Sequence, residues 1–157
     1  MSDESVLKRI RGLEDRARII DIVGKFAVSI DRRRWDDLAS CFADEIEFNT
    51  IRSGRWVRSG RAELIDTLQR AFEMYTATQH ISANHQITIT GDEAVALSTL
   101  NATHHLVGAP GGDFHQQVGY YEYHLVREPK MGWQITKVEQ FVHWQRGNQE
   151  IFDRTLA

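Results

Sequence analysis

Apolar residues in the N-terminal third recur every three or four positions. Counting back from Asp31, this spacing passes through Ala27, Gly24, Ile20 and Ala17, and Phe26, Val23 and Ile19 flank it. Such a period is typical of an amphipathic helix with one face turned toward a core. The pattern predicts a helix over residues 7–30, with Gly12 as its weak point. It also places Asp31 at the end of the inward face.

The remaining pattern predicts two further helices and a series of strands. A short helix is expected over residues 35–42. A longer one is expected over residues 60–75, where Leu64, Ile65, Leu68, Phe72 and Tyr75 share one side. Alternating apolar and polar residues predict strands. The strands cover residues 44–51, 56–57, 76–90, 94–107, 114–126 and 133–144, with turns at Ser53-Gly54, Gly91-Asp92, 109–112 and 129–132. The tail from Asn148 would form one helical turn or fray.

Helices followed by a long antiparallel meander indicate an α+β fold. At 157 residues, the chain is expected to form one domain spanning residues 1–157. Because a flat meander cannot cover so many inward residues, the sheet must curl strongly around the first helix. The expected result is a cone-shaped α+β barrel, with Asp31 pointing into its cavity.

Composition and charge exclude several classes of function. Apolar residues make up 41% and charged residues 26%, as in an ordinary soluble globule, and the net charge of -3 gives no nucleic-acid footprint. The short basic run 32–34 reads as a solvated helix end. Cys41 is the only cysteine, so no internal disulfide forms, and its apolar neighbours predict a buried thiol. No apolar run could span a membrane and no signal peptide is evident, so a cytoplasmic protein is expected.

Asp31 needs a partner, because an unpaired buried carboxylate is costly. His80, at the start of a long predicted strand, is the natural candidate. A carboxylate that holds one ring N–H of a histidine fixes the tautomer and leaves the other nitrogen free to accept a substrate proton. We therefore predict that Asp31 and His80 form a catalytic dyad. A pair that only stabilises the core is the alternative.

Several other side chains could line a substrate pocket. In a regular strand Asn84 shares a face with His80 and could hydrogen-bond a substrate, although a bulge would reverse this. Tyr121 and Tyr123 alternate with Gly119, where a missing side chain would leave room for a ligand, and a phenol can donate to a developing enolate. Structural roles are open for all of these residues. Further aromatic residues, Phe26, Phe48 and Trp56 among them, predict an apolar pocket for a hydrophobic cyclic compound.

Metal and nucleotide sites are not expected. The seven histidines lack any ligand spacing typical of zinc, since His80 and His85, like His104 and His105, should point to opposite faces of their strands. No glycine-rich phosphate loop is present. The expected protein therefore uses neither a metal nor another cofactor.

Local patterns along nearly the whole chain carry a resemblance to a known family. They are the segments 30–38 (IDRRRWDDL), 41–44 (CFAD), 60–63 (GRAE), 80–84 (HISAN), 91–94 (GDEA), 119–121 (GYY), 125–127 (LVR), 132–135 (GWQI) and 144–148 (WQRGN). In order and spacing they resemble the SnoaL-like branch of the NTF2-like superfamily. That branch includes scytalone dehydratase, a bile-acid dehydratase and a lindane dehydrochlorinase. The resemblance implies an Asp–His pair at Asp31 and His80 that removes a proton beside a leaving group without a cofactor.

Three hypotheses about function follow. The first is a cofactor-independent lyase or isomerase acting on a hydrophobic cyclic substrate. The second is a non-catalytic subunit similar to the small subunits of ring-hydroxylating oxygenases, and the third is a small-molecule carrier. Under the first two, apolar residues on the second face of the sheet favour a homo-oligomer, either a dimer or a trimer.

Overall fold

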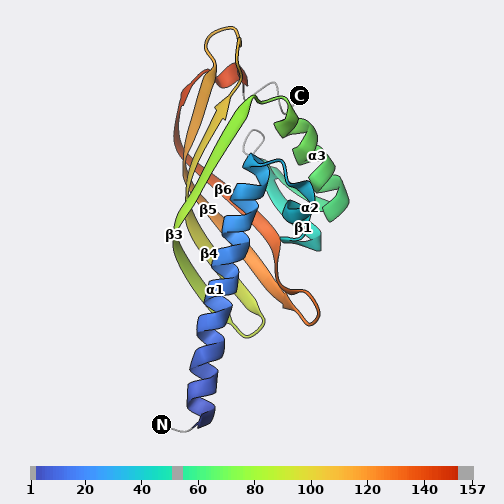
Figure 1. The fold of residues 1–157 in the computed structure, drawn as a ribbon, viewed down its shortest axis with the longest axis vertical. Coiled ribbons are helices and arrows are strands. Elements are labelled where there is room, and N and C mark those ends of the chain that lie inside the picture. The colour runs from blue at the N-terminus through green and yellow to red at the C-terminus, as the bar shows by residue number, and fades with distance from the viewer. Residues whose placement is uncertain (1–2, 51–54, 152–157) are drawn as a thin grey trace.

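The computed structural model describes residues 3–50 and 55–151 and has an α+β architecture (Figure 1). Helices α1 (Asp3–Asp31) and α2 (Trp35–Ala39) come first, followed by strands β1 (Phe42–Thr50) and β2 (Arg55–Gly60) and helix α3 (Arg61–Glu73). Four long strands complete the chain: β3 (Ala77–Thr90), β4 (Glu93–His105), β5 (Phe114–Glu128) and β6 (Gly132–Gly147). The described part of the chain contains no helix that is both long and apolar enough to span a membrane.

One curved sheet contains the six described strands in the order β2-β1-β6-β5-β4-β3. All neighbours are antiparallel except β1 and β6, which pair in parallel. Helix α1 lies across one face of the sheet, and α3 covers the end of that face nearest the C-terminus of α1 (Figure 1). The sheet curls as predicted, but it remains open between its edge strands β2 and β3 and does not close into a barrel.

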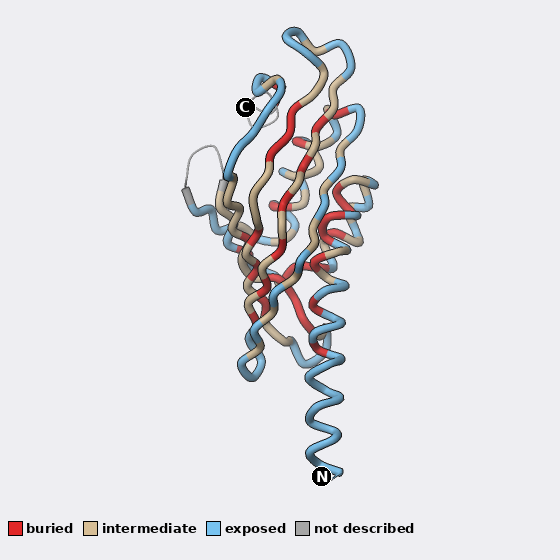
Figure 2. Tube along the Cα trace, turned by 90° about the vertical axis from the view of Figure 1, so that its left-hand side faces the viewer, coloured by how far each residue is buried: buried red, intermediate tan, exposed pale blue. Residues whose placement is uncertain are grey.

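The first helix is longer than its apolar pattern predicted and is not broken at Gly12. No atom lies within 4 Å of the position that a Cβ would take at Gly12, so this glycine faces open space. Residues 3–14 are exposed along the part of α1 that extends beyond the sheet (Figure 2). Helix α2 ends at Ala39 and so is shorter than predicted, whereas β2 is longer. The predicted turn at Ser53-Gly54 lies outside the described residues, and 149–151 form the helical turn expected in the tail.

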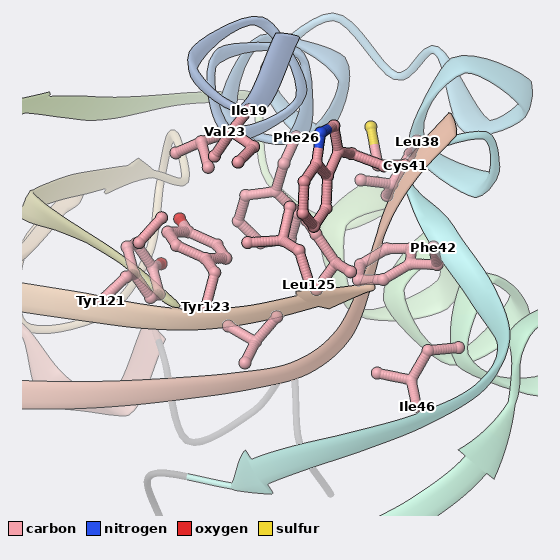
Figure 3. Packing of buried hydrophobic residues seen from close by; sticks show 14 of the residues in the cluster. Ile19, Val23, Phe26, Leu38, Cys41, Phe42, Ile46, Tyr121, Tyr123 and Leu125 are labelled. Carbon is pink, nitrogen blue, oxygen red and sulfur yellow. The ribbon is translucent and has the colours of Figure 1, made fainter. Parts of the chain in front are cut away.

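The core lies between α1 and the concave face of the sheet. Phe26 sits at its centre, and its ring meets those of Phe42, Tyr121 and Tyr123 edge-on at centroid distances of 5.9, 6.0 and 5.7 Å (Figure 3). All four residues are at most 6% exposed. Burying a side chain of this size contributes about 1.5–3 kcal/mol. Cys41 is fully buried at the edge of the same core, as predicted.

A clamp holds the middle of α1 to the far end of the sheet. Asp15 accepts hydrogen bonds from Arg127 at 2.6 and 2.7 Å and from the indole N–H of Trp133 at 3.1 Å. The Arg127 guanidinium also stacks 4.4 Å above the Trp133 ring. These bonds from Arg127 lower the pKa of the Asp15 carboxyl despite its burial. The clamp fixes where α1 crosses the sheet, and hence the position of Asp31 at the end of this helix.

A bulge in β3 decides which of its side chains face inward. The pairing of β3 with β4 shifts between Ala83 and Gln86, and Asn84 has a positive φ of 55°. One extra residue reverses the alternation of side chains beyond it. His80 therefore faces the same interior as Ile87 and Ile89, although it lies seven and nine positions before them and a regular strand would place it on the opposite face.

Gly119 lies beside a second irregularity, between β5 and β6. A Cβ at this position would lie 1.8 Å from the carbonyl oxygen of Phe141, which no side chain could tolerate. The pairing of these strands shifts between Val118 and Gly119. The glycine therefore permits close approach of two backbones, rather than leaving space for a ligand as the sequence suggested.

Candidate active site

Asp31 is the last residue of α1, and the chain turns sharply just beyond it. The backbone N–H groups of Arg32 and Arg34 donate to carbonyls of the last helical turn, and Arg33 has a positive φ of 57°. A non-glycine residue in this conformation costs about 1–2 kcal/mol. The turn brings the Asp31 side chain against the beginning of β3.

Asp31 holds His80 at two points. One carboxylate oxygen, Oδ1, lies 2.7 Å from the ring Nδ1, and the other, Oδ2, accepts the backbone N–H of His80 at 2.7 Å. The His80 side chain is 4% exposed and that of Asp31 is 18% exposed. Because a carboxylate can only accept, the Nδ1 of a neutral His80 carries the proton and Nε2 is its basic nitrogen. The pairing predicted from sequence is thus present, with the geometry of an oriented base.

A second layer of polar groups holds the carboxylate. Thr78 donates to Asp31 Oδ1 at 2.9 Å, and Arg33 donates to the Thr78 hydroxyl at 3.0 Å and to the carbonyl of Ile30 at 2.6 Å. Partial burial lowers the pKa of the Arg33 guanidinium, and the charge of Asp31 opposes that shift. Arg33, the strained residue in the turn after α1, therefore helps to hold Asp31 in place through Thr78.

Aromatic and imidazole rings surround His80. Its ring centroid lies 5.6 Å from Phe72 of α3 and 5.6 Å from His104 of β4, and His104 lies 4.8 Å from Tyr75 and 6.0 Å from His115. Burial lowers the pKa of His104 to about 3, with smaller contributions from His80, His115 and Arg33. His104 is thus a neutral neighbour of the dyad. Sequence reasoning recognised that only one of His104 and His105 faces inward, but it did not single out His104 or His115.

Tyr121 and Tyr123 extend this interior along β5, and Phe26 of α1 packs against both rings (Figure 3). Burial raises the pKa of Tyr121, and the charge of Asp31 raises it further, so Tyr121 lies within electrostatic reach of the dyad. Burial also raises the pKa of Tyr123 well above its ordinary value, even though the nearby Ser98 and Ser82 hydroxyls act in the opposite direction. Among the described residues no group meets hydrogen-bond geometry with the Tyr123 hydroxyl. Phe48 is partly buried and packs against the same core.

Two residues predicted to contact substrate lie elsewhere. The bulge leaves Asn84 exposed and out of line with His80, so its predicted inward orientation is wrong. Trp56 is 43% exposed, and its ring lies 4.1 Å from the ammonium of Lys137, so it does not line the interior. Lys137 lies opposite His124, whose side chain points away from the core, so Lys137 is on the outer face of the sheet. Its contact with the Trp56 ring places Trp56 on the same outer face.

A groove of about 310 Å³ also lies away from the dyad. It is formed largely by outward-facing residues near the turn that joins β3 to β4. Its lining residues are Thr88, Thr90, Glu93, Ala94, Val95, His124, Leu125, Val126 and Thr136. In the described ranges, no three His, Cys, Asp or Glu side chains are grouped so that they could hold a metal ion.

The fold is similar to several solved structures. Kfla4162 from Kribbella flavida has a TM-score of 0.84 and 25% identity, covering 90% of this chain and 99% of that one. A hexachlorocyclohexane dehydrochlorinase (LinA) type 2 has a TM-score of 0.74 and 20% identity, covering 89% and 93%. A proposed scytalone dehydratase from Novosphingobium aromaticivorans has a TM-score of 0.71 and 18% identity, covering 94% and 92%.

These similarities define the fold as NTF2-like, as the sequence resemblance implied. The sequence model of the SnoaL-like domain matches residues 11–139, and the chain belongs to this family. A comparison with curated protein sequences gave no match.

Proposed function

We propose that the protein is a lyase or isomerase that removes a proton from a hydrophobic cyclic small molecule without a cofactor. His80 acts as the general base, and Asp31 orients it and stabilises its protonated form. The observation that carries this proposal is the double attachment of His80 to Asp31, at 2.7 Å through the ring and 2.7 Å through the backbone. The carboxylate is held in turn by Thr78 and Arg33.

The chemistry follows from the tautomer. Nε2 of His80 takes a proton from an acidic C–H bond, and the electron pair stays on the substrate. In an elimination this pair forms a double bond while the leaving group departs with its own pair. In an isomerisation the pair moves through a conjugated system, and the proton returns to another carbon. A positioned base of this kind contributes roughly 10²–10⁴-fold to the rate.

The surroundings of the dyad favour an apolar substrate. Phe26, Tyr121 and Phe72 supply aromatic surface, and the phenol of Tyr121 lies within electrostatic reach of Asp31. Two proteins of the same fold are named for elimination from a ring compound or for dehydration, a dehydrochlorinase and a proposed dehydratase. Both names agree with a proton abstracted beside a leaving group.

The experiment measures turnover on three classes of compound. A chlorinated cyclohexane tests loss of chloride, a cyclic β-hydroxy ketone tests loss of water, and a β,γ-unsaturated cyclic ketone tests migration of a double bond. For the compound that is turned over, His80→Ala and Asp31→Asn should each lower kcat by roughly 10²–10⁴-fold. His124→Ala is the matched control, because His124 pairs with Glu122 on the outer face.

Full activity of both dyad variants would refute the proposal. Turnover of none of the compounds, together with copurification of a large oxygenase subunit, would instead support the non-catalytic subunit.

A further inference from the structure

Helix α1 carries an exposed apolar stripe on the side that faces away from the sheet. The stripe begins in the part of the helix that extends beyond the sheet (Figure 2), where Leu13 is 68% exposed. It continues over the part that packs on the sheet, where Ile20 is still 38% exposed. The exposed residues of this stripe are Val6, Ile10, Leu13, Ala17 and Ile20.

The opposite side of α1 contacts the core. The sequence pattern placed Ala17 and Ile20 on the inward face, but both are exposed. The flanking residues Ile19, Val23 and Phe26 are buried instead. Helix α1 therefore has two apolar sides, and the described part of the chain covers only one of them.

The spacing of the stripe is typical of a helix that packs along a second helix. Its residues follow one another at alternating intervals of four and three, an average of 3.5. A seam with this period stays aligned with the same seam on another helix. From Val6 to Ile20 it is about 21 Å long, at 1.5 Å per residue. A β-branched residue such as Ile10 alternating with a leucine such as Leu13 favours a pair of helices over larger bundles.

Charged residues border the stripe with opposite signs on its two sides. Arg9 and Arg16 lie along one side, and the exposed acids Glu14 and Asp21 lie along the other. In two parallel helices, a residue on the first side faces the residue five positions later on the second side of the partner helix. Arg9 thus meets Glu14 of a second copy, and Arg16 meets its Asp21. In an antiparallel pair like charges would meet, so the charges favour the parallel arrangement.

The seam is short, but α1 is already folded before it meets a partner. Isolated helices of this length are marginal in water, because the first turn is costly to form. Here Asp15 is bound to Arg127 and Trp133, and the core holds the remainder of the helix against the sheet. Pairing therefore does not bear the cost of forming the helix.

We propose that two copies of this chain pair through α1, with the two helices parallel and Leu13 at the centre of the contact. Each residue of the stripe then packs against its own counterpart, and the two sheets lie on the outside of the pair. This contact is separate from the outer sheet face, and it does not depend on the role of His80.

Light scattering of the full chain tests whether the stripe is an interface. Leu13→Glu puts a charge into the seam, where it has no partner, and should halve the measured mass at micromolar concentration. Val107→Glu is the matched control, because Val107 is an apolar residue of similar exposure, 63%, at the turn after β4. It should leave the mass unchanged. Circular dichroism of each variant shows whether the fold is retained.

Disulfide cross-linking tests the direction of the two helices. Val6→Cys should form a disulfide with its own counterpart on oxidation, and so should Ile20→Cys, because parallel helices place identical seam residues together. Lys8→Cys lies on the opposite side of the helix and should not cross-link. Cys41 is buried and so does not interfere.

Exchanging two charges tests the pairing between the sides of the stripe. Glu14→Lys and Arg9→Glu each place like charges together, and each should weaken the dimer roughly tenfold at low salt. A mixture of the two variants restores both pairs and should associate like the wild type. Arg16 is left unchanged in this test, because it also donates a hydrogen bond to the carbonyl of Ile87.

Three results would overturn the proposal. The first is a Leu13→Glu variant with the mass of the wild type. The second is a Val6→Cys variant that cross-links only with Ile20→Cys, because that would show antiparallel helices. The third is a wild type whose mass does not depend on Leu13 but whose binding to phosphatidylglycerol vesicles does, because the stripe would then contact lipid.

Discussion

His104 should make the protein less stable as the pH falls from 7 to 5. Burial lowers the pKa of this residue from its ordinary value of 6.5 to about 3, so it stays neutral in the folded protein over this range. In the unfolded chain it takes up a proton below about pH 6.5. The unfolded state then binds more protons than the folded state, and acidification favours unfolding. The slope is about 1.4 kcal/mol per pH unit, which amounts to about 2 kcal/mol between pH 6.5 and pH 5.

Urea unfolding followed by tryptophan fluorescence at pH 7, 6 and 5 measures this effect. His104→Gln removes the titration and should lose about 2 kcal/mol less than the wild type on acidification. His105→Gln is the control, because this neighbour lies on the opposite face of β4. Burial also lowers the pKa of His85, but His85 is present in all three proteins and cancels in the comparison. An equal loss of stability in the wild type and His104→Gln would refute the reasoning.

Three other predictions concern the core, the clamp on α1 and association. Burial raises the pKa of the Cys41 thiol to about 12, so iodoacetamide at pH 8 should label it only after unfolding, and rapid labelling of the native protein would contradict its placement. Asp15→Asn should cost about 2 kcal/mol in urea unfolding, since it weakens charged hydrogen bonds from Arg127, and the cost should vanish in an Arg127→Gln background. The lowered pKa of Asp15 means that this contribution is fully present above pH 3.8 and is lost as the pH falls through the lower, folded-state value. Self-association through the outer sheet face also stays a prediction. Trp144 is 50% exposed on that face, and Trp144→Glu should reduce the mass measured by light scattering. An unchanged mass would count against that face.

The elements that sequence predicted well are those with a strong local period. The apolar spacing of the first helix identified its inward face, and Asp31 does lie where that face ends. The long strands were predicted to within a few residues, because turn residues mark their ends clearly. A carboxylate on an inward face requires a partner, and this requirement, together with the family resemblance, suggested His80.

The errors concern features that depend on contacts between strands. Asn84 was expected beside His80, but a bulge changes the side-chain alternation and no local signal marks it. Trp56 is apolar and was therefore expected inside, although a cation on a neighbouring strand can cover such a ring at the surface. His104 was not singled out, because its contact with the His80 ring comes from the pairing of β3 with β4. That register can be read only after the strands are paired.

The bulge at Asn84 also has a consequence for how this strand can change over evolution. It divides β3 into a first half that carries His80 and a second half that packs Ile87 and Ile89 into the apolar core. The alternation of inward and outward side chains changes between the two halves. Side chains in the Ile87–Ile89 half can be exchanged to repack the interior without turning His80 away from Asp31. A deletion of one residue at the bulge would join the halves into a regular ladder, and only one of the two could then keep its inward side.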